Sequence, residues 1–124
     1  MSMSNIKTDL VDALSTITDV SVSYDYSTAA ESEKAIVIES LDMSYQHDLD
    51  MGWHKELTVN AVLITKTATD LDLLIDALEG IDNLSEGCIR DLMLEAITLD
   101  NKDEDVCIAS ATLSCLIWDV ASDG

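Results

Sequence analysis

The fold is decided by residues 53–80, which read WHKELTVNAVLITKTATDLDLLIDALEG and change their hydrophobic period halfway. As far as Lys66 the apolar and polar residues alternate, which predicts a β-strand with one buried face. After Thr69 or Asp70, either of which can cap a helix, apolar residues recur at helical spacing until Gly80. A strand followed by a helix is therefore expected. The buried positions are Leu57, Val59, Ala61 and Leu63 in the strand, and Leu71, Leu74, Ile75 and Leu78 in the helix.

The segment before this stretch predicts a helix and a first strand. Residues 4–18 carry Ile6, Leu10 and Leu14 at helical spacing, whereas 20–33 have no sustained period beyond a short extended piece at 20–24. Residues 34–45 alternate, and the polar QHDLDMG at 46–52 then reads as a hairpin loop that leads into the strand at 53. One side of the first strand would carry Ile36, Ile38 and Ser40, and the other Val37, Glu39, Leu41 and Met43.

The segment after residue 80 contains one ambiguous element and one clear one. Residues 85–99 fit either a helix capped by Ser85 or a strand, and we favour a strand over 91–99 because DNKDED at 100–105 resembles a hairpin turn. The run from Val106 to Trp118 alternates and is rich in β-branched residues. Its core side would be formed by Cys107, Ala109, Ala111, Leu113, Cys115 and Ile117.

The order helix, two strands, helix, two strands predicts an α+β fold. We expect an antiparallel sheet of about four strands with both helices packed on one face. The chain has no proline, no internal repeat and no linker, and its 124 residues suffice for one core. A single α+β domain over residues 1–124 is therefore expected.

The charge of the chain is strongly negative and excludes two classes of partner. There are 25 acidic residues against 6 basic ones, a net charge of −19, and the basic residues are scattered. Sequence-specific nucleic-acid binding and docking on an anionic membrane are not expected, because both need clustered Lys or Arg. Asp outnumbers Glu by 17 to 8, which suits a protein from a salty cell as well as an ordinary acidic surface. A folding stability that stays unchanged from low to molar salt would contradict the halophilic hypothesis.

The residues that carry catalysis or bind metals are few and poorly spaced. His47 and His54, with Asp48 and Asp50, match no standard metal site, and DNKDED has Lys102 where a calcium ligand belongs. The three cysteines, Cys88, Cys107 and Cys115, have no paired spacing and no adjacent histidine, so we expect buried, reduced thiols. No catalytic, cofactor or metal site is expected, and the chain is predicted not to be an enzyme.

One cluster of large side chains marks a candidate interaction surface. Five such residues gather around the first hairpin loop, and a long hairpin tip is a common way to reach a neighbouring subunit. An inward orientation of some of them is the alternative. The five are Met43, Tyr45, Leu49, Met51 and Trp53.

The order of these elements resembles the tail terminator (tail completion) proteins of long-tailed phages and tailed viruses. That resemblance implies a structural virion subunit that is assembled in the host cytoplasm. Such subunits form a ring, typically a hexamer. The ring would join the tail tube to the head connector and let DNA pass through its lumen, without catalytic residues. An acidic DNA-mimic inhibitor or another neck or head-completion subunit is the alternative. The resemblance rests on the helix ending near Ile17, the hairpin at 34–66, LDLLIDALEGIDNL at 71–84, IRDLMLEAITLDNKDED at 89–105 and ASATLSCLIWDV at 109–120.

Overall fold

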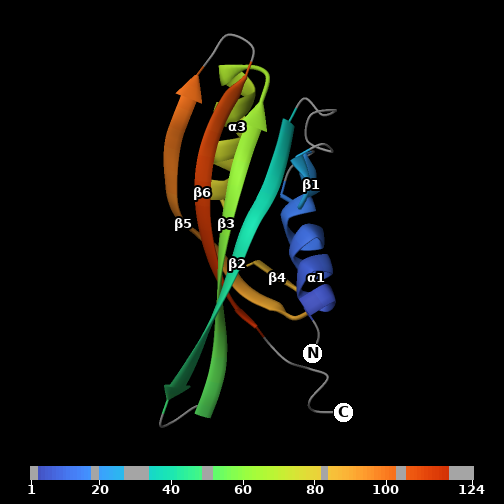
Figure 1. Cartoon of the computed structure of the whole chain (residues 1–124), viewed down its shortest axis with the longest axis vertical. Coiled ribbons are helices and arrows are strands. Elements are labelled where there is room, and N and C mark those ends of the chain that lie inside the picture. The colour runs from blue at the N-terminus through green and yellow to red at the C-terminus, as the bar shows by residue number, and fades with distance from the viewer. Residues whose placement is uncertain are drawn as a thin grey trace.

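Two helices and six strands follow one another along the described part of the chain (Figure 1). A computed structural model describes residues 3–17, 20–26, 34–48, 52–81, 84–102 and 106–117. The elements are α1 (Met3–Ser15), β1 (Ser21–Ser23), β2 (Lys34–Asp48), β3 (Gly52–Thr65), α3 (Ala68–Glu79), β4 (Leu84–Glu86), β5 (Ile89–Lys102) and β6 (Cys107–Ile117).

The six strands form one mixed sheet in the order β1-β2-β3-β6-β5-β4. The neighbours β2–β3, β3–β6, β6–β5 and β5–β4 are antiparallel, and β1 runs parallel to β2. The predicted α+β class is confirmed, but the prediction of four antiparallel strands is wrong. β1 lies within the short extended piece expected at 20–24, and both β1 and β4 have three residues, which is too short to show a period of two in the sequence.

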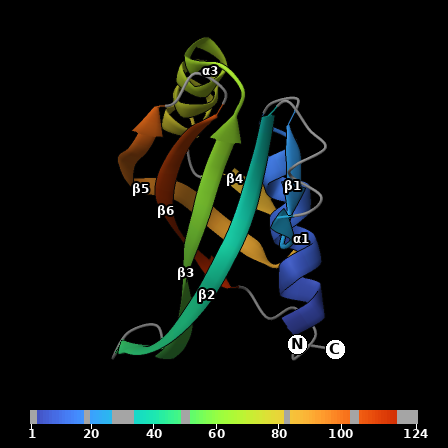
Figure 2. The same cartoon turned by 45° about the horizontal axis from the view of Figure 1, so that its top comes forward.

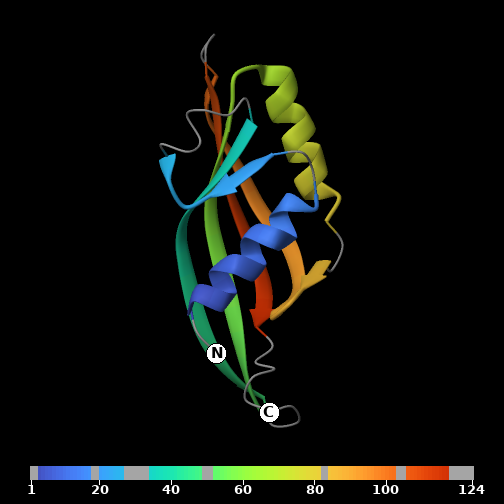
Figure 3. The ribbon, with the colours of Figure 1, turned by 90° about the vertical axis from the view of Figure 1, so that its right-hand side faces the viewer.

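The core lies between one face of the sheet and the two helices, as expected. Every second residue of β6 is buried, from Cys107 to Ile117. Leu10 and Leu14 of α1 and Leu74 of α3 belong to the same buried cluster as these positions. Figure 3 shows both helices on the same side of the sheet. The predicted core faces of β3 and β6 are therefore confirmed.

The sheet curls strongly, and α1 sits in the opening of the curl. β5 shows three register shifts against β6, and such bulges bend a strand and increase its twist. In Figure 2, β5 crosses behind β6, β3 and β2. As a result α1 contacts both edge strands, β1 and β4, while α3 packs on β2, β3, β5 and β6.

A β-bulge in β2 turns its second half toward the core. The register against β3 shifts between Ile38 and Ser40, which makes Glu39 an extra residue. Leu41 and Met43 consequently pack on the same core cluster as Ile38. The predicted alternation, which placed Leu41 and Met43 opposite Ile38, is wrong because one inserted residue moves all later side chains to the other face.

The boundaries of most elements differ from the predicted ones. β2 extends to Asp48 and β3 begins at Gly52, so part of the loop predicted at 46–52 belongs to the two strands. α1 ends at Ser15 and not at 18, and β5 already begins at Ile89. The N-cap of α3 is Thr67, whose Oγ1 accepts a hydrogen bond from the Asp70 amide at 3.1 Å, and neither Thr69 nor Asp70 is the cap. The C-terminal stop at Gly80 is confirmed.

Candidate interaction surfaces

The hairpin of β2 and β3 extends beyond the rest of the sheet as a two-stranded arm. Among the described residues, β6 pairs with β3 from Lys55 onward, where Lys55 lies opposite Ile117. Below that point the described pairing is between β2 and β3 alone, down to Asp48 and Gly52. In Figure 1 the far ends of both strands run past the other strands. A two-stranded hairpin is only marginally stable by itself, so a neighbouring surface would stabilise this arm.

The five predicted interaction residues lie on or near the arm, but they are not equivalent. Tyr45 is 64% exposed, whereas Met43 packs partly against the core. Trp53 lies in β3 with its backbone opposite His47. Leu49 and Met51 lie outside the described residues. Contact of this cluster with a partner stays a prediction.

Two tyrosines that follow β1 form hydrogen bonds, Tyr24 with α1 and Tyr26 with β2. Tyr24 Oη donates a hydrogen bond to the Lys7 carbonyl at 3.1 Å, and Lys7 Nζ lies 5.0 Å from the centre of the Tyr24 ring. Tyr26 Oη donates to the carboxylate of Glu39, the bulge residue. Burial raises the pKa of Tyr24 to about 12, and the hydrogen bond to Glu39, with burial second, raises that of Tyr26 to about 12. Both phenols are therefore protonated donors at neutral pH, and they hold β1 and α1 beside β2.

The face of the sheet turned away from the helices carries a row of small polar groups. Asn60 Nδ2 donates to Ser40 Oγ at 3.0 Å, and Thr112 Oγ1 donates to Asn60 Oδ1 at 3.4 Å. Ser114 Oγ donates to Glu95 Oε1 at 2.5 Å. This row crosses β2, β3, β6 and β5. Asn60 Nδ2 also donates to Asp42 Oδ2 at 3.5 Å. Hydroxyl and amide groups therefore share the middle of this face with the carboxylates of Asp42 and Glu95.

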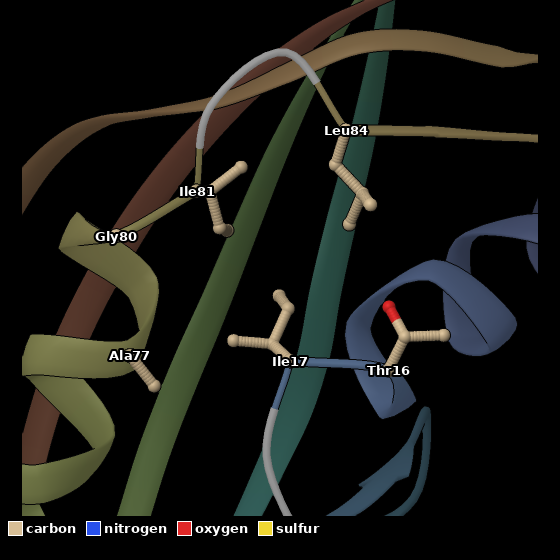
Figure 4. Close-up of a pocket in the computed structure, with 6 residues that line it drawn as sticks. All are labelled: Thr16, Ile17, Ala77, Gly80, Ile81 and Leu84. Atoms are coloured by element: carbon tan, nitrogen blue, oxygen red, sulfur yellow. The ribbon is translucent and has the colours of Figure 1, made fainter.

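A cavity of about 260 Å³ separates the C-terminal ends of the two helices. Figure 4 shows the side chains of Ile17, Ile81 and Leu84 around this space. The hydroxyl of Thr16, which also lines it, donates to the Ala13 carbonyl at 2.7 Å and so already has a partner. Ligand sites combine an apolar lining with a few convergent polar groups. The described lining provides no such polar set, so we interpret the cavity as a packing gap.

Neither the cysteines nor the possible metal ligands form a catalytic or metal site within the described residues. The three cysteines are free and buried, as predicted, and burial raises the pKa of Cys115 to about 12. No group of three or more His, Cys, Asp or Glu side chains that could hold a metal occurs in the described ranges. Asp50 and the side chains of His47, Asp48 and His54 lie outside the described atoms, so that expectation stays a prediction. Neither described helix is long and apolar enough to cross a membrane.

One polar contact joins α1 to the turn between β4 and β5. Asp9 Oδ2 accepts a hydrogen bond from the Cys88 amide at 2.9 Å, across 79 positions of sequence. Gly87 and Cys88 form a two-residue hairpin loop, because Glu86 pairs with Ile89. Gly87 has a φ of +56° and Cys88 has no positive φ, the pattern of a type II′ turn, which favours glycine at its first central position. Burial, with the hydrogen bond to Asp9 second, raises the pKa of Cys88 to about 11.

Exposed apolar side chains outside the arm were missed from the sequence. Met93 and Leu99 of β5 are 43% and 54% exposed, and Leu73 of α3 is 57% exposed. The sequence predicted a strand at 91–99 but not which of its side chains are exposed. The exposure of Met93 and Leu99 follows from the strand pairing, because β4 pairs with β5 only between Ile89 and Leu92. The local sequence does not contain this information.

The fold has a counterpart among solved structures. One chain of a structure described as the virion of a native gene transfer agent (GTA) particle superimposes with a TM-score of 0.51. The match covers 92% of this chain and 89% of that chain, at 15% sequence identity. No protein-family model matches the sequence, and no curated protein matches it either. At this identity the similarity establishes a shared fold.

Proposed function

We propose that the chain is a structural subunit of a phage-like particle, in which copies form a ring that closes the tail tube and contacts the head connector. The observation that carries the proposal is a fold shared, over nearly the whole length of both chains, with a chain from a gene transfer agent virion. The element order independently resembles that of tail terminator proteins. On this proposal the chain is located in the virion and has no catalytic role.

Two surface features support an assembling subunit. The β2–β3 arm projects from the body, with Tyr45 exposed on it, and aromatic residues are enriched in protein interfaces. The free edge of β5 carries exposed Met93 and Leu99. Both features expose apolar or unpaired structure that a neighbouring subunit would cover.

The main alternative, a DNA mimic, receives less support from the uncovered face of the sheet. A mimic needs an ordered row of carboxylates that imitates phosphates. The row across this face instead consists of the neutral side chains of Ser40, Asn60, Thr112 and Ser114, with two carboxylates, Asp42 and Glu95, bonded to it at separate points. We therefore favour the virion subunit.

Mass measurement tests the proposal directly. We expect light scattering and native mass spectrometry to detect a closed oligomer of about six copies in molar salt, and electron micrographs to show rings. Because repulsion among chains of net charge −19 is screened by salt, the oligomer should weaken at low ionic strength. A monomer at high concentration in both salts, with no ring even beside the tail-tube protein of the same particle, would contradict the proposal.

A further inference from the structure

We infer that the free edge of β5 between Met93 and Leu99 is the seam between copies, and that it pairs with the β2 strand of a second copy's arm. The inference rests on the proposed function and names the surfaces that would make the ring. It starts from the pairing of β5. β6 accompanies β5 from Ile89 to Lys102, whereas β4 pairs with the opposite edge only from Ile89 to Leu92. Among the described strands, none covers that edge beyond Leu92.

The stretch of this edge from Ala96 to Leu99 lacks the features that keep edge strands apart. Natural edges are protected by lysine, by proline, by bulges or by a covering element. Residues 93–99 (MLEAITL) contain neither lysine nor proline. Their one charge, Glu95, accepts the hydrogen bond from Ser114 and so bends back over the sheet. The bulges of β5 fall before Ala96 and after Leu99 and leave a regular stretch between these two residues.

The seam exposes apolar side chains on both faces of β5, because Met93 lies opposite Ser114 and Leu99 lies opposite the buried Ala109. Met93 and Leu99 are about half exposed, and Leu73 is exposed on α3, the helix that packs on β5. Leu94 and Ile97 are partly buried against the core. In a chain of net charge −19, a second copy would meet one carboxylate, Glu95, along this stretch and could bury apolar area there.

The β2 strand of a second copy can pair with this edge in the antiparallel direction. β2 and β5 run antiparallel within one sheet, because three antiparallel steps through β3 and β6 separate them. β1 accompanies β2 only over Ala35–Val37, so the arm presents β2 as its outer strand. A contact between the β5 edge of one copy and the β2 edge of the next is head-to-tail. Repeated contacts of this kind close into a ring when the rotation between neighbouring copies is a whole fraction of a turn. Pairing β5 with β5 of a second copy is the alternative arrangement, which would make the contact symmetric.

Mixed cross-linking distinguishes these arrangements. Asp42→Cys places a thiol on β2 just before the arm begins, beyond its pairing with β1. Ala96→Cys and Thr98→Cys place thiols on β5 at registers two residues apart, which keeps the same face. We expect a disulfide when the Asp42→Cys protein is mixed with one of the two β5 variants, but not when each variant is oxidised alone. Asp12→Cys, on the exposed side of α1, is the matched control and should not cross-link. Cross-linking of Thr98→Cys with itself, or no cross-link in either mixture, would overturn the inference.

Charged substitutions at the seam provide the second measurement. Met93→Lys with Leu99→Lys should raise the midpoint concentration of assembly by about tenfold or more, with monomer melting unchanged because both side chains are exposed. Val106→Lys, at another exposed apolar residue, should assemble like the parent. If the parent forms rings and the seam variant forms them equally well, the seam is wrong and the proposed function stands. A parent that never assembles would overturn both.

Discussion

Replacing Leu74 by alanine is expected to lower the free energy of unfolding by about 2–5 kcal/mol, the usual range for a fully buried leucine. Leu74 is 1% exposed and belongs to the core cluster beneath α3. The loss combines the transfer free energy of the removed carbon atoms with the cavity that remains where the surrounding structure does not relax. Urea denaturation followed by circular dichroism measures it as a shift in the midpoint at constant slope.

The neighbouring leucine is a matched control on the same helix. Leu73 is 57% exposed, so Leu73→Ala should change the free energy of unfolding of the monomer by no more than about 0.5 kcal/mol. The two variants share their chemistry and their helix, and differ only in burial. Equal losses for both would mean that α3 does not present the Leu71–Leu74–Leu78 face to the sheet.

That face of α3 and the core face of β6 were predictable because each follows a strict period. In β6 the residues from Cys107 to Ile117 alternate between buried and half-buried without interruption. In α3 the buried leucines recur at positions 71, 74 and 78. Where a period holds along a whole element, local sequence contains the information needed to orient it.

The faces of β2 and β5 were harder to predict because bulges break the period. The insertion at Glu39 depends on the register that β3 imposes, which is not written in the local alternation. Three such shifts in β5 place Leu92, Leu94 and Ile97 against the core at unequal spacing. This is why residues 85–99 fitted a helix and a strand about equally well.

The surfaces that could meet a partner were predictable only in part. The arm followed from two long strands around a polar loop, and Tyr45 is exposed on it. The free edge of β5 could not be foreseen, because it exists only where the three-residue β4 stops. The contact between Asp9 and the Cys88 amide joins residues 79 positions apart, and no pattern in the sequence near Asp9 predicts it.

Replacing Gly87 by alanine is expected to destabilise the protein by about 2–4 kcal/mol through two separate costs. The first is the positive φ of +56°, which a residue with a Cβ adopts only with strain. The second is steric, since a Cβ on Gly87 would lie 2.3 Å from Asp9 Oδ2. Asp9 would have to swing away and leave the Cys88 amide without its acceptor.

Gly80→Ala is the matched control for the first cost and Asp9→Ala for the second. Gly80 has a φ of −79°, and a Cβ there would meet its nearest atoms at 3.5 Å, so Gly80→Ala should be neutral or stabilise by up to about 1 kcal/mol. In the double variant Asp9→Ala/Gly87→Ala the clash is absent, and its loss should be smaller than the summed single losses by at least about 0.5 kcal/mol. Additive losses would mean that Asp9 does not pack on this turn. The backbone strain at Gly87 alone would then explain its cost, and α1 would be held in the curled sheet by its apolar face without the polar contact.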